Sequence, residues 1–245
     1  MPRRFQLEPD EEISKSAAKL RLLKKLHCTT KYEKEAWQAG AQFVAGVDEV
    51  GRGCLFGPVV AGAVILDPNY RIRGLRDSKL LPEKKRDEFA ARIKEHCLAW
   101  AIAAVDSARI DQLNIYHASK AAMLEAVSAL SIRPDFLLID AMVLDLPCAQ
   151  KKIIHGDALS ASIAAASIIA KVHRDALVRE WDPVYPAYGL ASNKGYGSKR
   201  HIEALREFGP SPLHRQSFAP VWNASAPQEV LEFMLETEDE AIKGD

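Results

Sequence analysis

Short apolar runs alternate with longer amphipathic stretches along the chain. A charged, amphipathic stretch at residues 5–40 predicts helix. Five apolar runs of strand length follow, at residues 43–50, 59–66, 98–105, 135–140 and 151–155. Since only a glycine-containing turn and a short loop separate the first two runs, we expect them to pair as an antiparallel hairpin.

Apolar residues at helical spacing predict helices between and after these strands. Pro82 suits the first position of one helix, and the alanine-rich run at 159–181 has the composition of a buried one. Ser198 is a suitable cap for a further helix that Gly209 ends. The predicted helices are at residues 82–97, 116–130, 159–181 and 198–209, with a last one from about residue 228. A hairpin followed by strands alternating with helices predicts an α/β fold with a mixed sheet.

Composition narrows the class of protein. Of 245 residues, 48% are hydrophobic, which is enough for a sizeable core, and no apolar run is long enough to span a membrane. The first residues lack the apolar stretch of a secretory signal. The four cysteines form no CxxC pair, which argues against a zinc site or a disulfide framework. We therefore expect a cytoplasmic protein without membrane association.

The formal net charge is zero, but the charges are unevenly distributed. Residues 226–245 hold seven acids and one base, which leaves 32 bases and 26 acids in residues 1–225. A mildly basic body can hold a phosphate backbone. Charge alone, however, favours an ordinary solvated surface with a solubilising tail. The charge distribution does not decide between these interpretations.

Four acids lie at the ends of predicted elements. Asp48 and Asp140 end two apolar strands, Glu49 follows Asp48, and Asp157 begins the alanine-rich helix region. Strand ends gather at one edge of an α/β sheet, where clustered carboxylates need a cation, and hard oxygen ligands suit Mg²⁺ or Mn²⁺. From spacing alone, acids that face solvent or pair with Lys and Arg are the better interpretation. Neighbouring strand residues also point to opposite faces, so Asp48 and Glu49 reach one ion only if the strand bends or a Glu49 carbonyl serves.

A set of sequence motifs makes the catalytic interpretation of these acids the better one. The motifs are, in order, AGVDEVGRG, GPVVAGAVIL, LRDSKLL, LNIYHASKAAM, LLIDA, GDALSASIAAASIIAKVHRD, NKGYGSKRHIEAL and HRQSF. Together they resemble the bacterial ribonuclease HII family, and the resemblance covers most of residues 43–222. It implies a ribonuclease H-like fold, a mixed sheet flanked by helices with a helical C-terminal part. We expect this catalytic domain at residues 43–222, between a helical N-terminal extension (1–42) and an acidic C-terminal helix or tail (223–245).

The resemblance also implies an activity and its residues. It implies an endoribonuclease, active as a monomer, that cuts the RNA strand of RNA–DNA hybrids and incises duplex DNA at embedded ribonucleotides. Two Mn²⁺ or Mg²⁺ ions would assist hydrolysis and leave 3′-OH and 5′-phosphate ends. Asp48, Glu49, Asp140 and Asp157 match the catalytic acids, the first three as metal ligands; Gly51, Arg52 and Gly53 match the ribose-reading turn, and Tyr196 the tyrosine at the RNA–DNA junction. Glycines suit that turn, because a backbone without Cβ can approach the 2′-OH closely.

Other polar residues of the matched blocks are candidates for phosphate contacts. They are Ser78, Lys79, Lys194, His214 and Arg215. For each of them a structural or solvated role is about as good an interpretation. For Asp175, a further acid on the alanine-rich helix, we expect an ion pair with Arg179 four residues later.

Two other function classes remain to be weighed. A resolvase or integrase-like nuclease could share the fold, but the Gly-Arg-Gly turn beside the acids argues against it. A non-catalytic hybrid-binding module is the second alternative. Such a module would have little reason to keep unneutralised carboxylates against a phosphate backbone.

Overall fold

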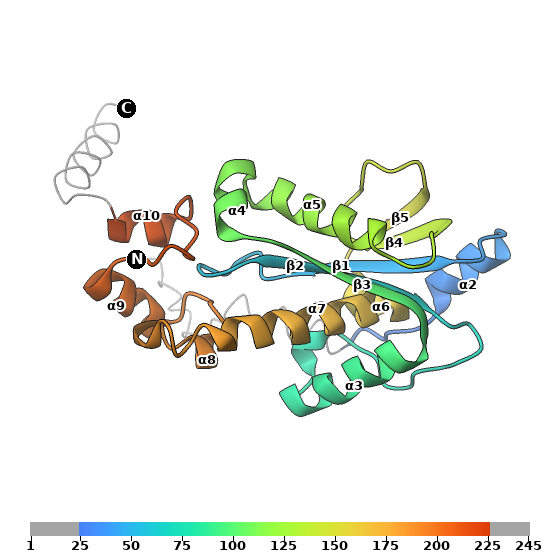
Figure 1. Cartoon of the computed structure of the whole chain (residues 1–245). Coiled ribbons are helices and arrows are strands. Elements are labelled where there is room, and N and C mark those ends of the chain that lie inside the picture. The colour runs from blue at the N-terminus through green and yellow to red at the C-terminus, as the bar shows by residue number, and fades with distance from the viewer. Residues whose placement is uncertain (1–24, 226–245) are drawn as a thin grey trace, which may run out of the picture.

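The computed structural model describes residues 25–225 of the chain and is built on one five-stranded sheet (Figure 1). The strands are β1 (Val44–Val50), β2 (Val59–Leu66), β3 (Cys97–Val105), β4 (Phe136–Asp140) and β5 (Ala149–Ile153), in the spatial order β3-β2-β1-β4-β5. β1 pairs antiparallel with β2 and parallel with β4. The predicted hairpin and mixed sheet are therefore confirmed.

Helices cover both faces of the sheet (Figure 1). α4 (Ser107–Leu113) and α5 (Ile115–Ser128) lie on one face, where they share a core cluster with Ala45 and Val47 of β1. α3 (Glu83–His96) and α7 (Ala161–Glu180) lie on the other face and pack against Val64 of β2. This layered arrangement buries a sheet on two sides, which explains why the strands are nearly continuous apolar runs.

Two glycines let α7 lie directly on the hairpin. A Cβ on Gly46 of β1 would fall 2.0 Å from the backbone carbon of Ser162, and one on Gly62 of β2 would fall 2.5 Å from the carbonyl oxygen of Ala166. Side chains alternate along a strand, so Asp48, two residues after Gly46, faces α7 as well. Close contact between α7 and β1 thus sets the position of the first predicted acid.

Part of the expected N-terminal extension is packed against the sheet. α2 (Lys31–Gln38) contacts β1 and β4, and it carries the buried acid Glu33. One carboxylate oxygen of Glu33 accepts hydrogen bonds from the Ser160 hydroxyl (2.6 Å) and the Ser162 amide (2.8 Å). An acid is favourable there, because the first amides of α7 lack partners within the helix. Residues 1–24 of the extension lie outside the described residues.

The C-terminal part forms a helical layer beyond one end of the sheet (Figure 1). It comprises η2 (Pro186–Tyr188), α8 (Leu190–Asn193), α9 (Lys199–Phe208) and α10 (Ala219–Ser225). The Ser198 hydroxyl accepts from the His201 amide at the start of α9, and Gly209 ends the helix at φ +71°, as predicted. The expected helix from residue 228 lies outside the described residues.

The predicted helix at 159–181 is divided in the structure. Ser160 has extended backbone, so a short helix, α6 (Gly156–Leu159), precedes it and α7 begins at Ala161. The Ser160 hydroxyl then caps α7 by accepting from the Ile163 amide (3.3 Å). In the part of the chain that the structure covers, no helix is both long and apolar enough to cross a membrane.

Candidate active site

Two of the predicted acids lie on adjacent parallel strands. β1 and β4 are in register from Val44 opposite Phe136 to Val47 opposite Ile139, so Asp48 and Asp140 follow at neighbouring positions. Both occupy the alternate positions of their strands that face α7. Asp48 is almost fully buried, and Asp140 is partly buried at the very end of β4.

Asp157 reaches the same edge of the sheet from α6. The Gly156 amide donates to the Asp140 carboxylate (2.7 Å), which ties the start of α6 to the end of β4. Asp157, the next residue, is buried and accepts from the Lys79 ammonium (3.0 Å). Three acids that are far apart in the sequence are thereby held at one place.

Glu49 lies on the opposite face of β1 from Asp48, as the alternation of the strand requires. Its Oε1 is 3.2 Å from the Arg52 guanidinium, whereas its Oε2 is buried without a hydrogen-bond partner among the described residues. Burial, partly offset by Arg52, raises the pKa of Glu49 to about 7. The Glu49 side chain is therefore turned to the predicted ribose-reading turn in this structure.

The clustering of acids changes their titration. Burial raises the pKa of Asp48 well above its ordinary range, and the carboxylates of Glu49, Asp140 and Asp157 raise it further. Burial also raises the pKa of Asp140, against the opposing hydrogen bond from the Gly156 amide. A cation among these groups would remove this repulsion.

The donor set suits a hard divalent cation. All four groups are carboxylates, the ligands preferred by Mg²⁺ and Mn²⁺, and the buried Oε2 of Glu49 has no hydrogen-bond partner within residues 25–225. As the side chains lie, no three acids, histidines or cysteines of residues 25–225 are arranged to hold one ion. Each of the four acids instead directs an oxygen at a protein donor: Glu49 N for Asp48, Arg52 for Glu49, Gly156 N for Asp140 and Lys79 for Asp157.

The Gly-Arg-Gly turn begins where β1 ends. Gly51 has φ +94°, and a Cβ there would lie 2.1 Å from the Arg174 Nε, so this position requires glycine. Gly53 has open space around it, and Arg52 is exposed. The turn therefore presents backbone atoms and one guanidinium to solvent beside the acids.

Two buried arginines hold the turn from below. The Arg174 guanidinium donates to the carbonyls of Phe56 (3.0 Å), Pro58 (3.0 Å) and Lys194 (2.8 Å). The Arg215 guanidinium donates to the carbonyls of Arg52 (2.8 Å) and Gly57 (3.0 Å). Sequence reasoning did not assign a role to Arg174; a cation on an otherwise buried alanine-rich helix was the available signal.

Tyr196 lies next to the same turn. Its backbone pairs with that of Cys54 in an isolated antiparallel bridge. The centre of its ring is 5.6 Å from the Lys171 ammonium and 6.0 Å from the Arg174 guanidinium carbon. Burial and the neighbouring Cys54 raise the pKa of Tyr196 to about 12. With 41% of its surface exposed, the ring can still contact a bound ligand.

His214 is buried, which favours the structural role over the phosphate contact, two interpretations that the sequence left about equal. Its Nδ1 accepts from the Ser211 amide (2.9 Å), which leaves Nε2 as the donor to His201 Nε2 (3.0 Å). His201 Nδ1 then donates to the Tyr196 carbonyl (2.9 Å). Burial and the neighbouring His201 lower the pKa of His214 to about 4, so His214 is neutral at pH 7. The hydrogen bonds from His214 through His201 support the loop that carries Tyr196, here called the tyrosine loop.

The remaining predicted contacts are placed as follows. Arg215 is fully buried beneath the turn, where its guanidinium donates to backbone carbonyls. Ser78 is buried, with its hydroxyl 3.0 Å from that of Ser167. The Lys194 ammonium turns back onto the Ala191 carbonyl. Of the five candidates, Lys79 contacts the acid cluster, through Asp157. It also pairs with Asp77, a buried acid that begins the DSK motif and that sequence reasoning missed.

The predicted ion pair between Asp175 and Arg179 is wrong. Asp175 pairs instead with Lys171 (2.7 Å) and lies 3.8 Å from Arg86 of α3. The Arg179 side chain extends to Glu83 (2.9 Å) because α3 packs alongside α7. Asp175 thus keeps a local pair, but with Lys171 four residues before it, and Arg179 makes a tertiary contact instead.

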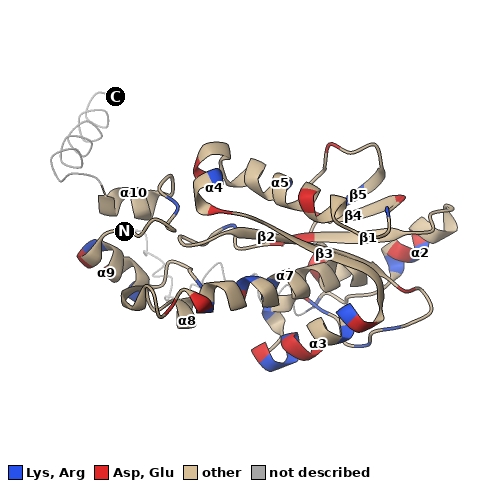
Figure 2. Ribbon diagram, in the orientation of Figure 1, with Lys and Arg blue, Asp and Glu red and all other residues tan. Residues whose placement is uncertain are grey.

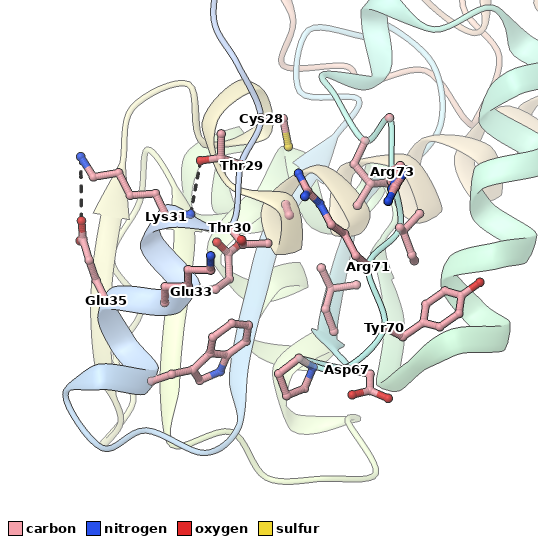
Figure 3. Close-up of a pocket in the computed structure, with 18 of the residues that line it drawn as sticks. Cys28, Thr29, Thr30, Lys31, Glu33, Glu35, Asp67, Tyr70, Arg71 and Arg73 are labelled. Atoms are coloured by element: carbon pink, nitrogen blue, oxygen red, sulfur yellow. Dashed lines mark hydrogen bonds and ion pairs between the residues drawn. The ribbon is translucent and has the colours of Figure 1, made fainter.

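A large cavity lies away from the acids. It has a volume of about 930 Å³ and is bordered by α2 and by the loop after β2, with Arg71 and Arg73 on one side and Glu33 and Thr30 on the other (Figure 3). None of the four acids lines it. The ribbon of Figure 2 marks acidic positions on the strands of the sheet and both acidic and basic positions on α7. We therefore identify the candidate active site with the acids and the turn.

Comparisons with known proteins agree with this arrangement. Residues 45–221 match the family model for ribonuclease HII. A ribonuclease HII of Koribacter versatilis is 75% identical over 231 residues, which are 94% of this chain and 91% of the relative. The crystal structure of ribonuclease H2 from Pyrococcus horikoshii is 25% identical with a TM-score of 0.65, over 75% of this chain and 97% of that chain.

A more distant structure shares the fold alone. Bst-RNase HIII in complex with Mn²⁺ is 20% identical with a TM-score of 0.57, over 77% of this chain and 71% of that chain. The ribonuclease H-like fold predicted from the sequence is thus confirmed. The chain belongs to the ribonuclease HII family, and it is a ribonuclease H that cleaves the RNA strand of RNA–DNA hybrids.

Proposed function

We propose that the protein also incises duplex DNA at embedded ribonucleotides, by hydrolysis that leaves 3′-OH and 5′-phosphate ends. The observation that carries this proposal is the position of Gly51, which directly follows β1, three residues after Asp48, and opens the turn. A ribose sensor and the acids are thereby only a few residues apart. An enzyme built this way needs one 2′-OH for recognition and does not need a continuous RNA strand.

We propose that Asp48, Glu49 and Asp140 hold two divalent cations, Mn²⁺ or Mg²⁺, with Asp157 completing the site. Bound metal would activate the attacking water and stabilise the leaving oxygen. The Mn²⁺ in the Bst-RNase HIII structure supports a divalent ion for this fold. Glu49 can serve through its unpaired Oε2 only if its side chain turns from the Arg52 side of the strand.

The residues around the acids have separate proposed tasks. The backbone of Gly51 to Gly53 donates to and accepts from the 2′-OH, and Arg52 meets the adjacent phosphate with its planar guanidinium. Lys79 makes a phosphate contact, whereas Arg174, Arg215 and the two histidines position the turn and the tyrosine loop. Since one chain supplies all these groups, we propose that a monomer is the active form. We also propose that it acts in the cytoplasm.

One assay tests the proposal directly. The purified protein is incubated with a DNA duplex that carries one ribonucleotide and with the same duplex made wholly of DNA, each with EDTA, Mg²⁺ or Mn²⁺. We expect a single cut at the ribonucleotide, only with metal. Cleavage of a long RNA–DNA hybrid without any cut at a single ribonucleotide would contradict the proposal.

Replacing Tyr196 with alanine is expected to slow cleavage at an RNA–DNA junction about tenfold. The exposed ring is lost, and stacking of an aromatic ring on a base contributes about 1–3 kcal/mol. Tyr196→Phe keeps the ring and serves as the matched control, with a rate within about threefold of the original protein. Single-turnover rates on a junction substrate measure both. Equal rates for the alanine variant would make the ring a packing residue.

A further inference from the structure

The ammonium of Lys79 supplies a positive charge to the acid cluster from within the protein itself. Its ammonium lies 3.0 Å from Asp157 Oδ2 and 3.5 Å from Asp77 Oδ1. Although burial opposes the charge, the carboxylates of Asp157, Asp77 and Asp48 raise the pKa of Lys79, so the ammonium stays charged at neutral pH. An ammonium between two carboxylates does part of what a metal ion would do there.

The backbone around Lys79 is fixed, while the end of its side chain is free to move. Residues 78–80 form the short helix η1; Asp77 Oδ1 accepts from the Lys79 amide (2.8 Å), and Arg86 donates to the Leu81 carbonyl (2.6 Å). The Lys79 side chain is nevertheless 59% exposed. Its flexible four-carbon side chain can therefore move without disturbing the backbone of η1.

Asp77 offers the ammonium a second resting place. Its side chain is fully buried, and its Oδ2 has no hydrogen-bond partner within residues 25–225. An unpaired buried carboxylate oxygen is costly, so a state in which Lys79 turns to Asp77 recovers a charge-assisted hydrogen bond. Asp157 would then be free to face a metal ion.

We propose that Lys79 competes with metal for Asp157 and moves onto Asp77 when metal binds. This inference deepens the proposed function and rests on its metal site. Lys79 is a positioning residue in this role, because it controls which partner Asp157 has. Metal uptake would thereby be linked to a lysine that also lies ready for a substrate phosphate.

Mn²⁺ binding to the nucleic-acid-free protein, measured by the free-Mn²⁺ signal in electron paramagnetic resonance, tests this. Lys79→Met is expected to tighten Mn²⁺ binding roughly tenfold, because one competing charge beside a dication is removed. Lys79→Arg keeps the charge and is expected to stay within about threefold of the original affinity. Lys85→Met, which removes an exposed lysine paired with Glu88 on α3, is the matched control and should change nothing.

A double-mutant cycle separates the exchange from a simple field effect. Asp77→Asn is expected to weaken Mn²⁺ binding about threefold or more, since Lys79 then stays on Asp157. In the Lys79→Met background the same substitution should have no effect. An equal effect of Asp77→Asn in both backgrounds would overturn the exchange, and unchanged or weaker binding by Lys79→Met would overturn the competition. Absence of any Mn²⁺ binding by the original protein would instead contradict the proposed metal site itself.

Discussion

Replacing Asp48 or Asp140 with asparagine is expected to abolish cleavage, by at least about 10³-fold. The two carboxylates lie at neighbouring positions of β1 and β4, and they are the strongest candidates to hold metal. Asparagine retains the shape and one acceptor oxygen but removes the charge that a dication needs. Binding of an RNA–DNA hybrid should be largely preserved, because the turn and Tyr196 are unchanged.

The Asp48→Asn variant is expected to be more stable than the original protein when metal is absent, by about 1 kcal/mol. The pKa of Asp48 is raised in the folded state, so the folded protein binds this proton more tightly than the unfolded chain does. The contribution of Asp48 to the stability of the metal-free protein therefore falls as pH rises above about 4, the ordinary carboxyl range. The gain from asparagine should be present at pH 8 and absent below pH 4.

Thermal unfolding with EDTA at several pH values measures the gain, and a cleavage assay with Mn²⁺ measures the loss. Glu88→Gln is a suitable control, because Glu88 is an exposed acid on α3 that pairs with the exposed Lys85. Full activity of either asparagine variant would remove that acid from the site. A metal-free Asp48→Asn variant less stable than the original at pH 8 would show that the carboxylate is not under strain.

The convergence of Asp48 and Asp140 could be predicted because it depends on local pattern. Each acid ends an apolar strand, and parallel neighbouring strands bring such ends together. The alternation of β1 likewise predicts that Glu49 lies on the other face from Asp48. These features are encoded in runs of a few residues.

The buried residues that support the turn and the tyrosine loop could not be predicted, because their partners are backbone carbonyls and residues of distant helices. Arg215 and His214 have the residue types of phosphate contacts, yet both are buried. Carbonyl acceptors carry no sequence signal, so nothing in the sequence separates a buried arginine from an exposed one. The predicted partner of Asp175 shows the same limit, since Arg179 pairs instead with Glu83 of α3, a contact that the sequence of α7 does not reveal.

Arg174→Ala is expected to cost about 3–5 kcal/mol of folding free energy. The guanidinium is fully buried and satisfies three carbonyls, those of Phe56, Pro58 and Lys194. Alanine leaves these acceptors buried without donors and opens a cavity beneath Gly51. Chemical denaturation measures the loss, and less than about 1 kcal/mol would contradict the assigned role.

Arg179→Met on the same helix is the matched control. Its guanidinium pairs with Glu83 at the surface, where both side chains are about half exposed, and such pairs contribute at most about 1 kcal/mol. Arg174→Lys tests the geometry, because one ammonium cannot replace a fork that spans three acceptors. We expect this variant to fold but to cleave more slowly.

The reason lies in what the three carbonyls belong to. Phe56 and Pro58 follow the proposed ribose-reading turn, and Lys194 precedes Tyr196 in the loop from the C-terminal layer. Arg174 therefore joins the two segments that we propose to contact substrate to α7, which itself lies on β1 beside Asp48. Weaker contacts between residue 174 and these segments in Arg174→Lys should raise KM and lower kcat together. If Arg174 only stabilised the fold, both constants would be unchanged for the folded fraction of the variant. Steady-state kinetics of Arg174→Lys below its unfolding temperature distinguish these results.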